Sequence, residues 1–236
     1  MKIIMKPIFS RLDDHLTKNR KQILIFAVLF FVVTRIVSMI AIGFAARLYF
    51  LYGFDAMASL RFGGSLEGIV YESMEKGLWR TLAMIVVGAP LLEECAFRLG
   101  LSFRRCDVSI GLGALTLFLA SRVTGSWLWA MIPAVVVAAA VQLATTEMFW
   151  SRLKPKWLKP AAVASAVLFG LAHLFAMHGL SWITLPYALL LCLMLFFTGA
   201  TFVYLRVNLG FGWAVGAHVL NNLPSVLLLL SMTIGS

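Results

Sequence analysis

Long apolar runs, separated by short polar connections, constrain the fold of this 236-residue chain more than any other feature. They cover residues 23–52, 78–103, 108–121, 126–149, 160–179, 181–205 and 209–234. Because a helix needs about 20 mostly apolar residues to cross a bilayer, these runs predict an all-α, polytopic transmembrane bundle with about seven spans. Hydrophobic residues make up 61% of the chain, against about 45–50% in soluble domains. We therefore expect one transmembrane domain over residues 23–236.

Basic residues gather in the short polar segments. Lys and Arg are frequent in residues 1–22, 104–107 and 151–159, which alternate with poorly basic connections. The positive-inside rule places these segments and Arg206 in the cytoplasm, with residues 1–22 as a basic cytoplasmic tail and residues 151–159 as a basic loop. The net charge of +10 is then explained by topology and by contacts with the lipid bilayer, and it indicates no nucleic-acid partner.

The longest polar connection, residues 53–77, is more acidic than basic. After Gly63 and Gly64, apolar residues recur in it at helical spacing. This pattern predicts a short interfacial helix, which would be an eighth helix of the fold, or a lid over an entrance.

The second apolar run contains Glu93, Glu94 and Arg98. Each charge costs about 2.5–3.5 kcal/mol at the centre of a membrane helix, so a functional site is the default interpretation. Glu94 and Arg98 are four residues apart and lie on one helical face, where they can pair. Glu93 is turned by about 100° and has no such partner, so its carboxylate is predicted to be available.

Two later runs also contain polar clusters. Phe169 and His173 are four residues apart in the fifth run, as are His218 and Asn222 in the seventh. Counted from the predicted cytoplasmic ends, Glu93, His173 and His218 lie at similar depths, very roughly 14–20 Å at 1.5 Å per residue. We therefore expect them to meet at one level of the membrane.

Such a cluster fits three chemistries. In hydrolysis, a glutamate takes a proton from water, one histidine holds that water, and an imidazole with an amide stabilises the oxyanion. In metal-assisted hydrolysis, Glu93, His173 and His218 hold a divalent metal such as zinc. In proton-coupled transport, the same groups relay protons. A scaffold that regulates partner membrane proteins without catalysis is the further alternative.

Two other features interrupt apolar runs. Arg35, near the middle of the first run, is expected to pair with a carboxylate or with backbone carbonyls, in a structural role or at the site. Pro90 and Pro133 predict local kinks, and the backbone groups that they free need partners within the bundle.

The three clusters together resemble the motifs of one family. Glu93 to Arg98 resembles E-E-x-x-x-R, Phe169 to His173 resembles F-x-x-x-H, and His218 to Asn222 resembles H-x-x-x-N. In this order, in separate spans, they resemble the motifs of the CPBP family, the CAAX proteases and bacteriocin-processing enzymes also called the Abi family. The resemblance covers roughly residues 80–225.

The resemblance implies an intramembrane endopeptidase that acts on a membrane-associated protein or peptide. Glu93 would be the general base and His173 its partner in positioning water, while His218 and Asn222 would form the oxyanion site. Arg98 would brace the motif through Glu94, and Phe169 would support it. Both a glutamate-activated water, which requires no cofactor, and a metal-dependent mechanism remain open. The compact chain with its short basic N-terminus is similar to bacterial plasma-membrane members, linked to peptide processing and bacteriocin immunity, more than to the eukaryotic prenyl-protein proteases.

Overall fold

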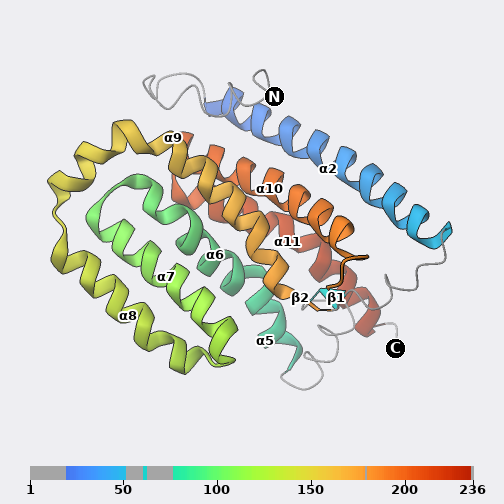
Figure 1. The fold of residues 1–236 in the computed structure, drawn as a ribbon. Coiled ribbons are helices and arrows are strands. Elements are labelled where there is room, and N and C mark those ends of the chain that lie inside the picture. Colours follow the sequence, from blue (N-terminus) through green and yellow to red (C-terminus); the bar gives the residue numbers. More distant parts are fainter. Residues whose placement is uncertain (1–19, 52–60, 63–76, 179, 235–236) are drawn as a thin grey trace.

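The computed structural model describes residues 20–51, 61–62, 77–178 and 180–234, and this part of the chain is almost entirely helical (Figure 1). The helices are α2 (Arg20–Leu51), α5 (Leu78–Ala83), α6 (Ala89–Arg98), α7 (Arg105–Thr124), α8 (Trp127–Ala144), α9 (Glu147–Ala172), α10 (Leu185–Asn208) and α11 (Phe211–Ile234). A π-helical turn, Met84–Gly88, joins α5 to α6, and 3₁₀ turns follow α6 (Leu99–Ser102) and α9 (His173–Ala176). Two short strands, β1 (Arg61–Phe62) and β2 (Met177–His178), pair antiparallel.

Among the described residues, four helices are long and apolar enough to cross a membrane: Arg20–Leu48 within α2, and all of α7, α8 and α10. They confirm the predicted class of an all-helical membrane protein. The predicted runs 78–103, 160–179 and 209–234 are largely helical but are not among these four. In residues 78–103, the π turn breaks the helix and charged residues interrupt the apolar sequence. Residues 160–179 begin within α9, whose first half contains several basic residues.

The prediction of a basic loop at residues 151–159 is wrong, because these residues lie inside α9. The helix begins where the Thr146 side chain accepts a hydrogen bond from the backbone N–H of Phe149, and Glu147 in the first turn complements the helix dipole. Pro155 and Pro160 are inside the helix. They remove hydrogen bonds and bend a helix without ending it, and Figure 1 shows the first half of α9 strongly curved.

The fifth predicted span also ends earlier than expected. Helix α9 stops at Ala172, so His173 begins a 3₁₀ turn instead of lying within the span. The strand that follows pairs Phe62 with Met177 and Arg61 with His178, which brings part of the 53–77 connection beside the segment after His173. The predicted interfacial helix or lid in residues 63–76 lies outside the described residues, as do residues 1–19 of the predicted tail. The last three residues of that tail, 20–22, belong to α2 instead, because the helix begins at Arg20.

Pro90 acts as predicted, by freeing a backbone group. In the π turn, the N–H of Ala89 donates to the carbonyl of Met84, five residues earlier. The next bond in this register would join residue 90 to Ile85, but proline has no N–H. The Ile85 carbonyl therefore needs another donor.

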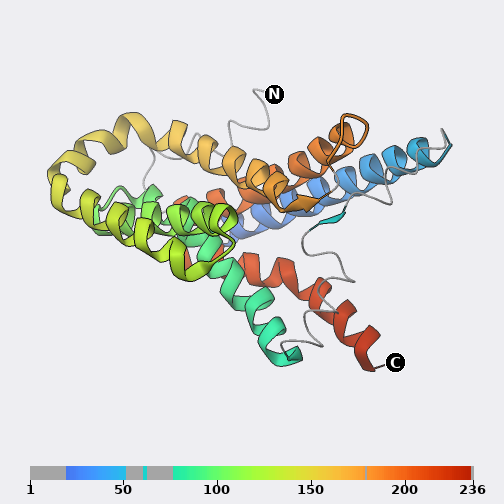
Figure 2. The same cartoon turned by 60° about the horizontal axis from the view of Figure 1, so that its bottom comes forward.

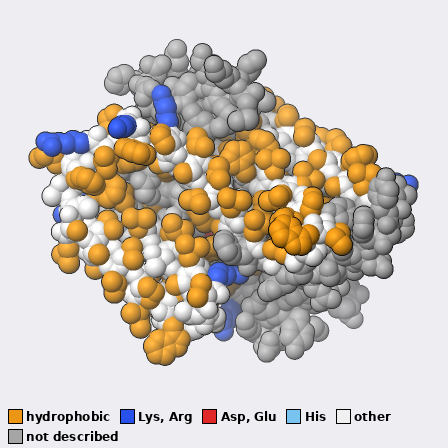
Figure 3. Space-filling model, viewed as in Figure 1, with side chains coloured by type: hydrophobic (Ala, Val, Ile, Leu, Met, Phe, Trp, Pro, Cys, Tyr) orange, Lys and Arg blue, Asp and Glu red, His pale blue; other side chains and the backbone are white. Residues whose placement is uncertain are grey.

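Helix α10 packs against α2, α9 and α11, while α6 packs against α7, and α7 against α8 (Figure 1). Figure 2 shows α5 and the second half of α11 projecting together from this layer. Aromatic residues of four helices form the core between them: Phe97, Phe118, Phe169 and Phe202. Hydrophobic side chains are spread over the described part of the face in Figure 3, as contact with lipid requires, and the Lys and Arg side chains on it lie mainly toward its margins, including over the first half of α9.

We predict that Gly170→Ala loosens the contact between α9 and α10. A Cβ at residue 170 would lie 2.7 Å from the carbonyl oxygen of Cys192 and 3.1 Å from the backbone nitrogen of Phe196. Backbone atoms cannot move aside cheaply, so we expect a loss of about 1–3 kcal/mol in the free energy of unfolding, measured by denaturation in detergent.

Gly43→Ala is the matched control, since a Cβ at residue 43 of α2 has no neighbour within 4 Å. Alanine there should be neutral or stabilising by up to about 1 kcal/mol. Equal stability of the two variants would contradict this packing of α9 on α10.

Candidate active site

The candidate site is built on the buried ion pair of α6. Nη1 of Arg98 donates to Oε1 of Glu94 at 2.8 Å, and both side chains are fully buried. The pairing predicted from their spacing is therefore confirmed. A buried pair of this kind is costly to separate, because removal of one partner leaves an uncompensated charge in an apolar region.

Aromatic rings surround the rest of the Arg98 guanidinium. Among the described residues, Nε and Nη2 of Arg98 and Oε2 of Glu94 are buried without a hydrogen-bond partner. The guanidinium carbon lies 4.0 Å from the centre of the Phe169 ring and 5.6 Å from that of Phe202. These cation–π contacts compensate part of the lost solvation. They explain why Phe169 is fixed at this position.

Gly199 makes room for this arrangement. A Cβ at residue 199 would lie 3.0 Å from Nη2 of Arg98 and 2.9 Å from the Phe169 ring. The backbone of α10 can approach the charge only because this residue has no side chain. Sequence reasoning missed Gly199, because a lone glycine in an apolar run carries no signal of what it contacts.

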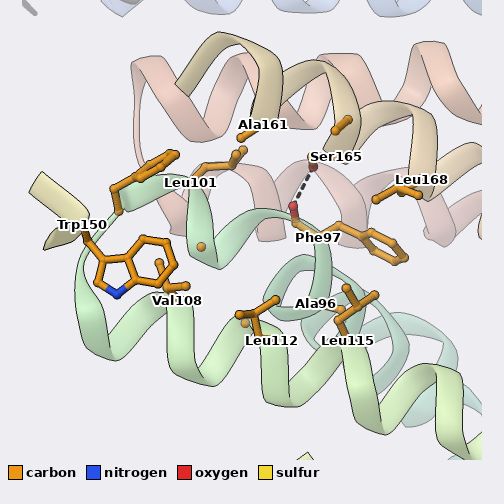
Figure 4. A pocket seen from close by; sticks show the side chains of 14 residues that line it. Ala96, Phe97, Leu101, Val108, Leu112, Leu115, Trp150, Ala161, Ser165 and Leu168 are labelled. Atoms are coloured by element: carbon orange, nitrogen blue, oxygen red, sulfur yellow. Dashed lines mark hydrogen bonds between the residues drawn. The ribbon is translucent and has the colours of Figure 1, made fainter. Parts of the chain in front are cut away.

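Two neighbouring helices hold the C-terminal end of α6. The Ser165 hydroxyl of α9 donates to the carbonyl of Phe97 at 2.6 Å (Figure 4). From α10, Arg206 donates to the carbonyls of Arg98 and Leu99, at 3.2 and 3.3 Å. Beside this anchor, Figure 4 shows an apolar cavity of about 300 Å³ lined by residues of α6, α7 and α9. These bonds satisfy carbonyls that a helix end leaves without intrahelical partners, so the charged helix is fixed from both sides.

His218 of α11 lies between the two glutamates. Its Nδ1 is 2.9 Å from Oε1 of Glu94, and its Nε2 is 3.7 Å from Oε2 of Glu93. Because a carboxylate can only accept, Nδ1 must carry the hydrogen of the shorter contact. Phe202 stacks on the imidazole with ring centres 4.7 Å apart. The ring is therefore fixed in both tautomer and direction.

Glu93 is the more accessible of the two carboxylates. Its side chain keeps 16% of its surface exposed, whereas Glu94 keeps none. The sequence predicted that Glu93 would be available, and the structure adds His218 as its neighbour. One carboxylate of the motif is thus committed to the ion pair, and the other faces a histidine with part of its surface open.

His173 contacts the Phe169 ring, which in turn contacts His218 of this cluster. Its Nδ1 donates to the carbonyl of Phe169 at 2.7 Å, so in the neutral ring Nε2 is the acceptor. Its ring centre is 4.9 Å from that of Phe169, which is 5.7 Å from that of His218. Within the described residues, no hydrogen bond or ion pair joins His173 to Glu93. The Phe169 ring therefore contacts both histidines, and His218 is the histidine that lies beside Glu93.

Asn222 supplies the donor that the π turn lacks. Its Nδ2 donates to the carbonyl of Ile85 at 3.0 Å, and its Oδ1 accepts from Nδ2 of Asn221 at 3.1 Å. Asn221 in turn accepts a hydrogen bond from Arg35 of α2. The sequence predicted carboxylate or carbonyl partners for Arg35, and this amide partner was missed, although Asn221 stands directly beside the predicted Asn222.

The predicted metal ligands do not form a metal-binding group. Among the described residues, no three His, Cys, Asp or Glu side chains are placed together so that they could hold a metal ion. Glu93, His173 and His218 therefore do not fit the zinc ligand set in this arrangement.

In comparisons with known proteins, no protein-family model, no curated protein and no solved structure matches this chain. The site must be interpreted from its own geometry and from the motifs in the sequence.

We predict that Arg98→Met strongly destabilises the protein. Glu94 would remain as a buried carboxylate without its guanidinium partner, held only by Nδ1 of His218, and loss of one partner of a buried pair costs about 3–5 kcal/mol. Thermal or denaturant unfolding in detergent measures this loss.

Arg104→Met, at an exposed position beyond the end of α6, is the control and should change stability little. Adding Glu94→Gln to Arg98→Met should recover part of the stability, because the unpaired charge is then removed. Additive losses in the double variant would contradict the coupling of these two residues.

Proposed function

We propose that this chain is an intramembrane endopeptidase in which Glu93 activates a water molecule. The single observation that supports this most is the position of His218 between two glutamates with different environments. Glu94 is neutralised by Arg98 and serves as support, so Glu93 is left for proton transfer. A division of roles between adjacent carboxylates is what general acid–base catalysis requires.

The proposed reaction uses the polar groups in sequence. A water lies between Glu93 and Nε2 of His173, and Glu93 takes its proton as the resulting hydroxide attacks the peptide carbonyl carbon. The carbonyl oxygen becomes an oxyanion, which His218 and Asn222 stabilise by donating hydrogen bonds. As the tetrahedral intermediate collapses, the C–N bond breaks and Glu93 returns its proton to the leaving amine. Water is consumed, and the products are a carboxylic acid and an amine, between which a proton transfer gives a carboxylate and an ammonium group.

His218 can donate to the oxyanion only in its imidazolium form. Its Nδ1 hydrogen is committed to Glu94, so Nε2 must also carry a hydrogen to act as a donor.

The three motifs support the same assignment, because their order and spacing resemble those of the CPBP family. The expected substrate is a membrane-associated protein or peptide, reached from the cytoplasmic side or laterally from lipid. No feature of the described residues selects a prenylated substrate over an unmodified peptide, so both belong in the assay.

The proposed membrane arrangement has seven spans, with the broken segment α5–α6, the second half of α9, and α11 added to the four apolar helices. The basic first half of α9 then lies at the cytoplasmic interface, where its Lys and Arg side chains contact anionic headgroups. The N-terminus is cytoplasmic, and a bacterial plasma membrane is the proposed location.

We expect Glu93→Gln to abolish peptide cleavage while the protein still folds. Glutamine keeps the shape of the side chain but cannot take a proton, and loss of a general base lowers the rate by about 10²–10⁴-fold. The measurement is a peptidase assay of purified protein on a mixed peptide library that includes prenylated C-terminal peptides, with and without chelator.

Glu147→Gln, at an exposed glutamate far along the chain, is the matched control and should retain activity. Cleavage that is lost in Glu93→Gln and is insensitive to chelator supports glutamate-activated water. Loss on chelation would instead indicate a metal enzyme. If the wild-type protein cleaves nothing and its cellular phenotype survives Glu93→Gln, the scaffold function is the correct one.

The orientation can be tested by labelling single cysteines in a variant without Cys95, Cys106 and Cys192. Lys156→Cys, in the basic half of α9, should react with a membrane-impermeant maleimide only after the membrane is opened. Trp182→Cys, whose side chain is 89% exposed between β2 and α10, should react in intact cells. Reaction of Lys156→Cys in intact cells would reverse the proposed orientation.

A further inference from the structure

Arg35 is a charged residue near the middle of α2, one of the four helices apolar enough to cross a membrane. A charge at this depth is costly and usually faces the bundle interior, where it marks a function. Its side chain is half-buried and is directed toward α10 and α11. None of the carboxylates that the structure describes pairs with it. Its role must therefore come from its other contacts.

Within the part of the chain that the structure describes, three contacts hold the Arg35 guanidinium. Nη2 donates to Oδ1 of Asn221 on α11, and Nη1 lies 3.5 Å from the sulfur of Met194 on α10. The guanidinium carbon is 5.0 Å from the centre of the Phe31 ring, one turn earlier on α2. The Asn221 oxygen is thus the strong acceptor among these partners.

A guanidinium fixes the direction of an amide, because it has donors and no acceptor. Arg35 requires the oxygen of Asn221 to face it, so the Asn221 nitrogen faces Asn222. This nitrogen requires the oxygen of Asn222, and only the Asn222 nitrogen is then left for the carbonyl of Ile85. The direction of each bond follows from the one before.

This series of hydrogen bonds ends at the carbonyl of Ile85, which needs a donor. In the π turn, the residue in register to donate to the Ile85 carbonyl is Pro90, which has no N–H. Reversal of either amide would place two oxygens together or leave this carbonyl unpaired. Arg35 and Pro90 therefore define the two ends of one directed network, and both ends require the same orientation of Asn222.

We propose that Arg35 is a positioning residue that acts through Asn221 to fix the donor face of Asn222. The inference rests on the proposed function, in which Asn222 helps to stabilise the oxyanion. One Nδ2 hydrogen of Asn222 is committed to Ile85, and the other is the hydrogen that serves the oxyanion. Without Arg35, Asn221 can turn over, and Asn222 loses the contact that sets its direction.

The first test needs no activity, so it remains decisive even if the proposed function fails. The chain contains four asparagines, so protein labelled with ¹⁵N-asparagine in nanodiscs gives few side-chain amide signals, and Asn222→Asp assigns the one of interest. Arg35→Met should shift the Asn222 signals or split them into two sets. Arg47→Met, at an exposed position on the same helix, should leave them unchanged.

Arg35→Gln is the second variant, in case methionine prevents folding. Glutamine can present either its oxygen or its nitrogen to Asn221, so it keeps a hydrogen bond but no longer dictates its direction. Two sets of Asn222 signals are expected. A single unshifted set in both Arg35 variants overturns the inference.

The second test uses cleavage of a library peptide, once loss of activity in Glu93→Gln has established the enzyme. Arg35→Met should lower kcat by about 10-fold, less than the 10²–10³-fold expected for loss of an oxyanion donor, with KM unchanged. In an Asn222→Ala background, the same change should have no further effect. An equal loss in both backgrounds would show that Arg35 acts independently of Asn222 and would overturn the inference.

Discussion

The ion pair of Glu94 and Arg98 is the interaction on which the rest of the structure depends. Both side chains are fully buried, and charges without partners in such a place would cost several kcal/mol each. The surrounding helices supply what the pair needs: aromatic faces from Phe169 and Phe202, a histidine donor from α11, and a close approach of α10 at Gly199. The convergence of α6, α9, α10 and α11 thus follows from the need to accommodate two charges in an apolar interior.

The same pair accounts for the different environments of two adjacent glutamates. Neighbouring residues on a helix are turned by about 100° from each other, so the Glu94 side chain points into the core and the Glu93 side chain does not. Oε1 of Glu94 accepts from both Arg98 and His218, and this fixes the imidazole so that its other nitrogen faces Glu93. The fully buried Glu94 thereby orients His218 beside the partly exposed Glu93. The proposed chemistry at Glu93 depends on this indirect support.

Features set by local sequence were predictable, and features set by packing were not. The i,i+4 pair of Glu94 and Arg98, the helical membrane class and the backbone group freed by Pro90 follow from spacing, hydropathy and the missing N–H of proline. The helix through residues 151–159 was mistaken for a loop, because charge and proline predict a break, whereas the cap at Thr146 and a bend allow the helix to continue. The position of His173 on a 3₁₀ turn and the contact of Gly199 with Arg98 depend on other segments of the chain. No local pattern encodes such contacts.

Two guanidinium groups enter the site from different sides, and each begins a directed set of hydrogen bonds. In the first set, Arg98 and His218 both donate to Glu94. In the second, Arg35 donates to Asn221, Asn221 donates to Asn222, and Asn222 donates to the carbonyl of Ile85. A side chain that only donates removes the ambiguity of amides and imidazoles, which can otherwise turn over. Water normally compensates for a reversed amide, but it is scarce in an apolar bundle, so a wrong orientation leaves buried groups unpaired. Each arginine in the bundle thus gives a single, fixed orientation to the polar groups that are hydrogen-bonded in its network.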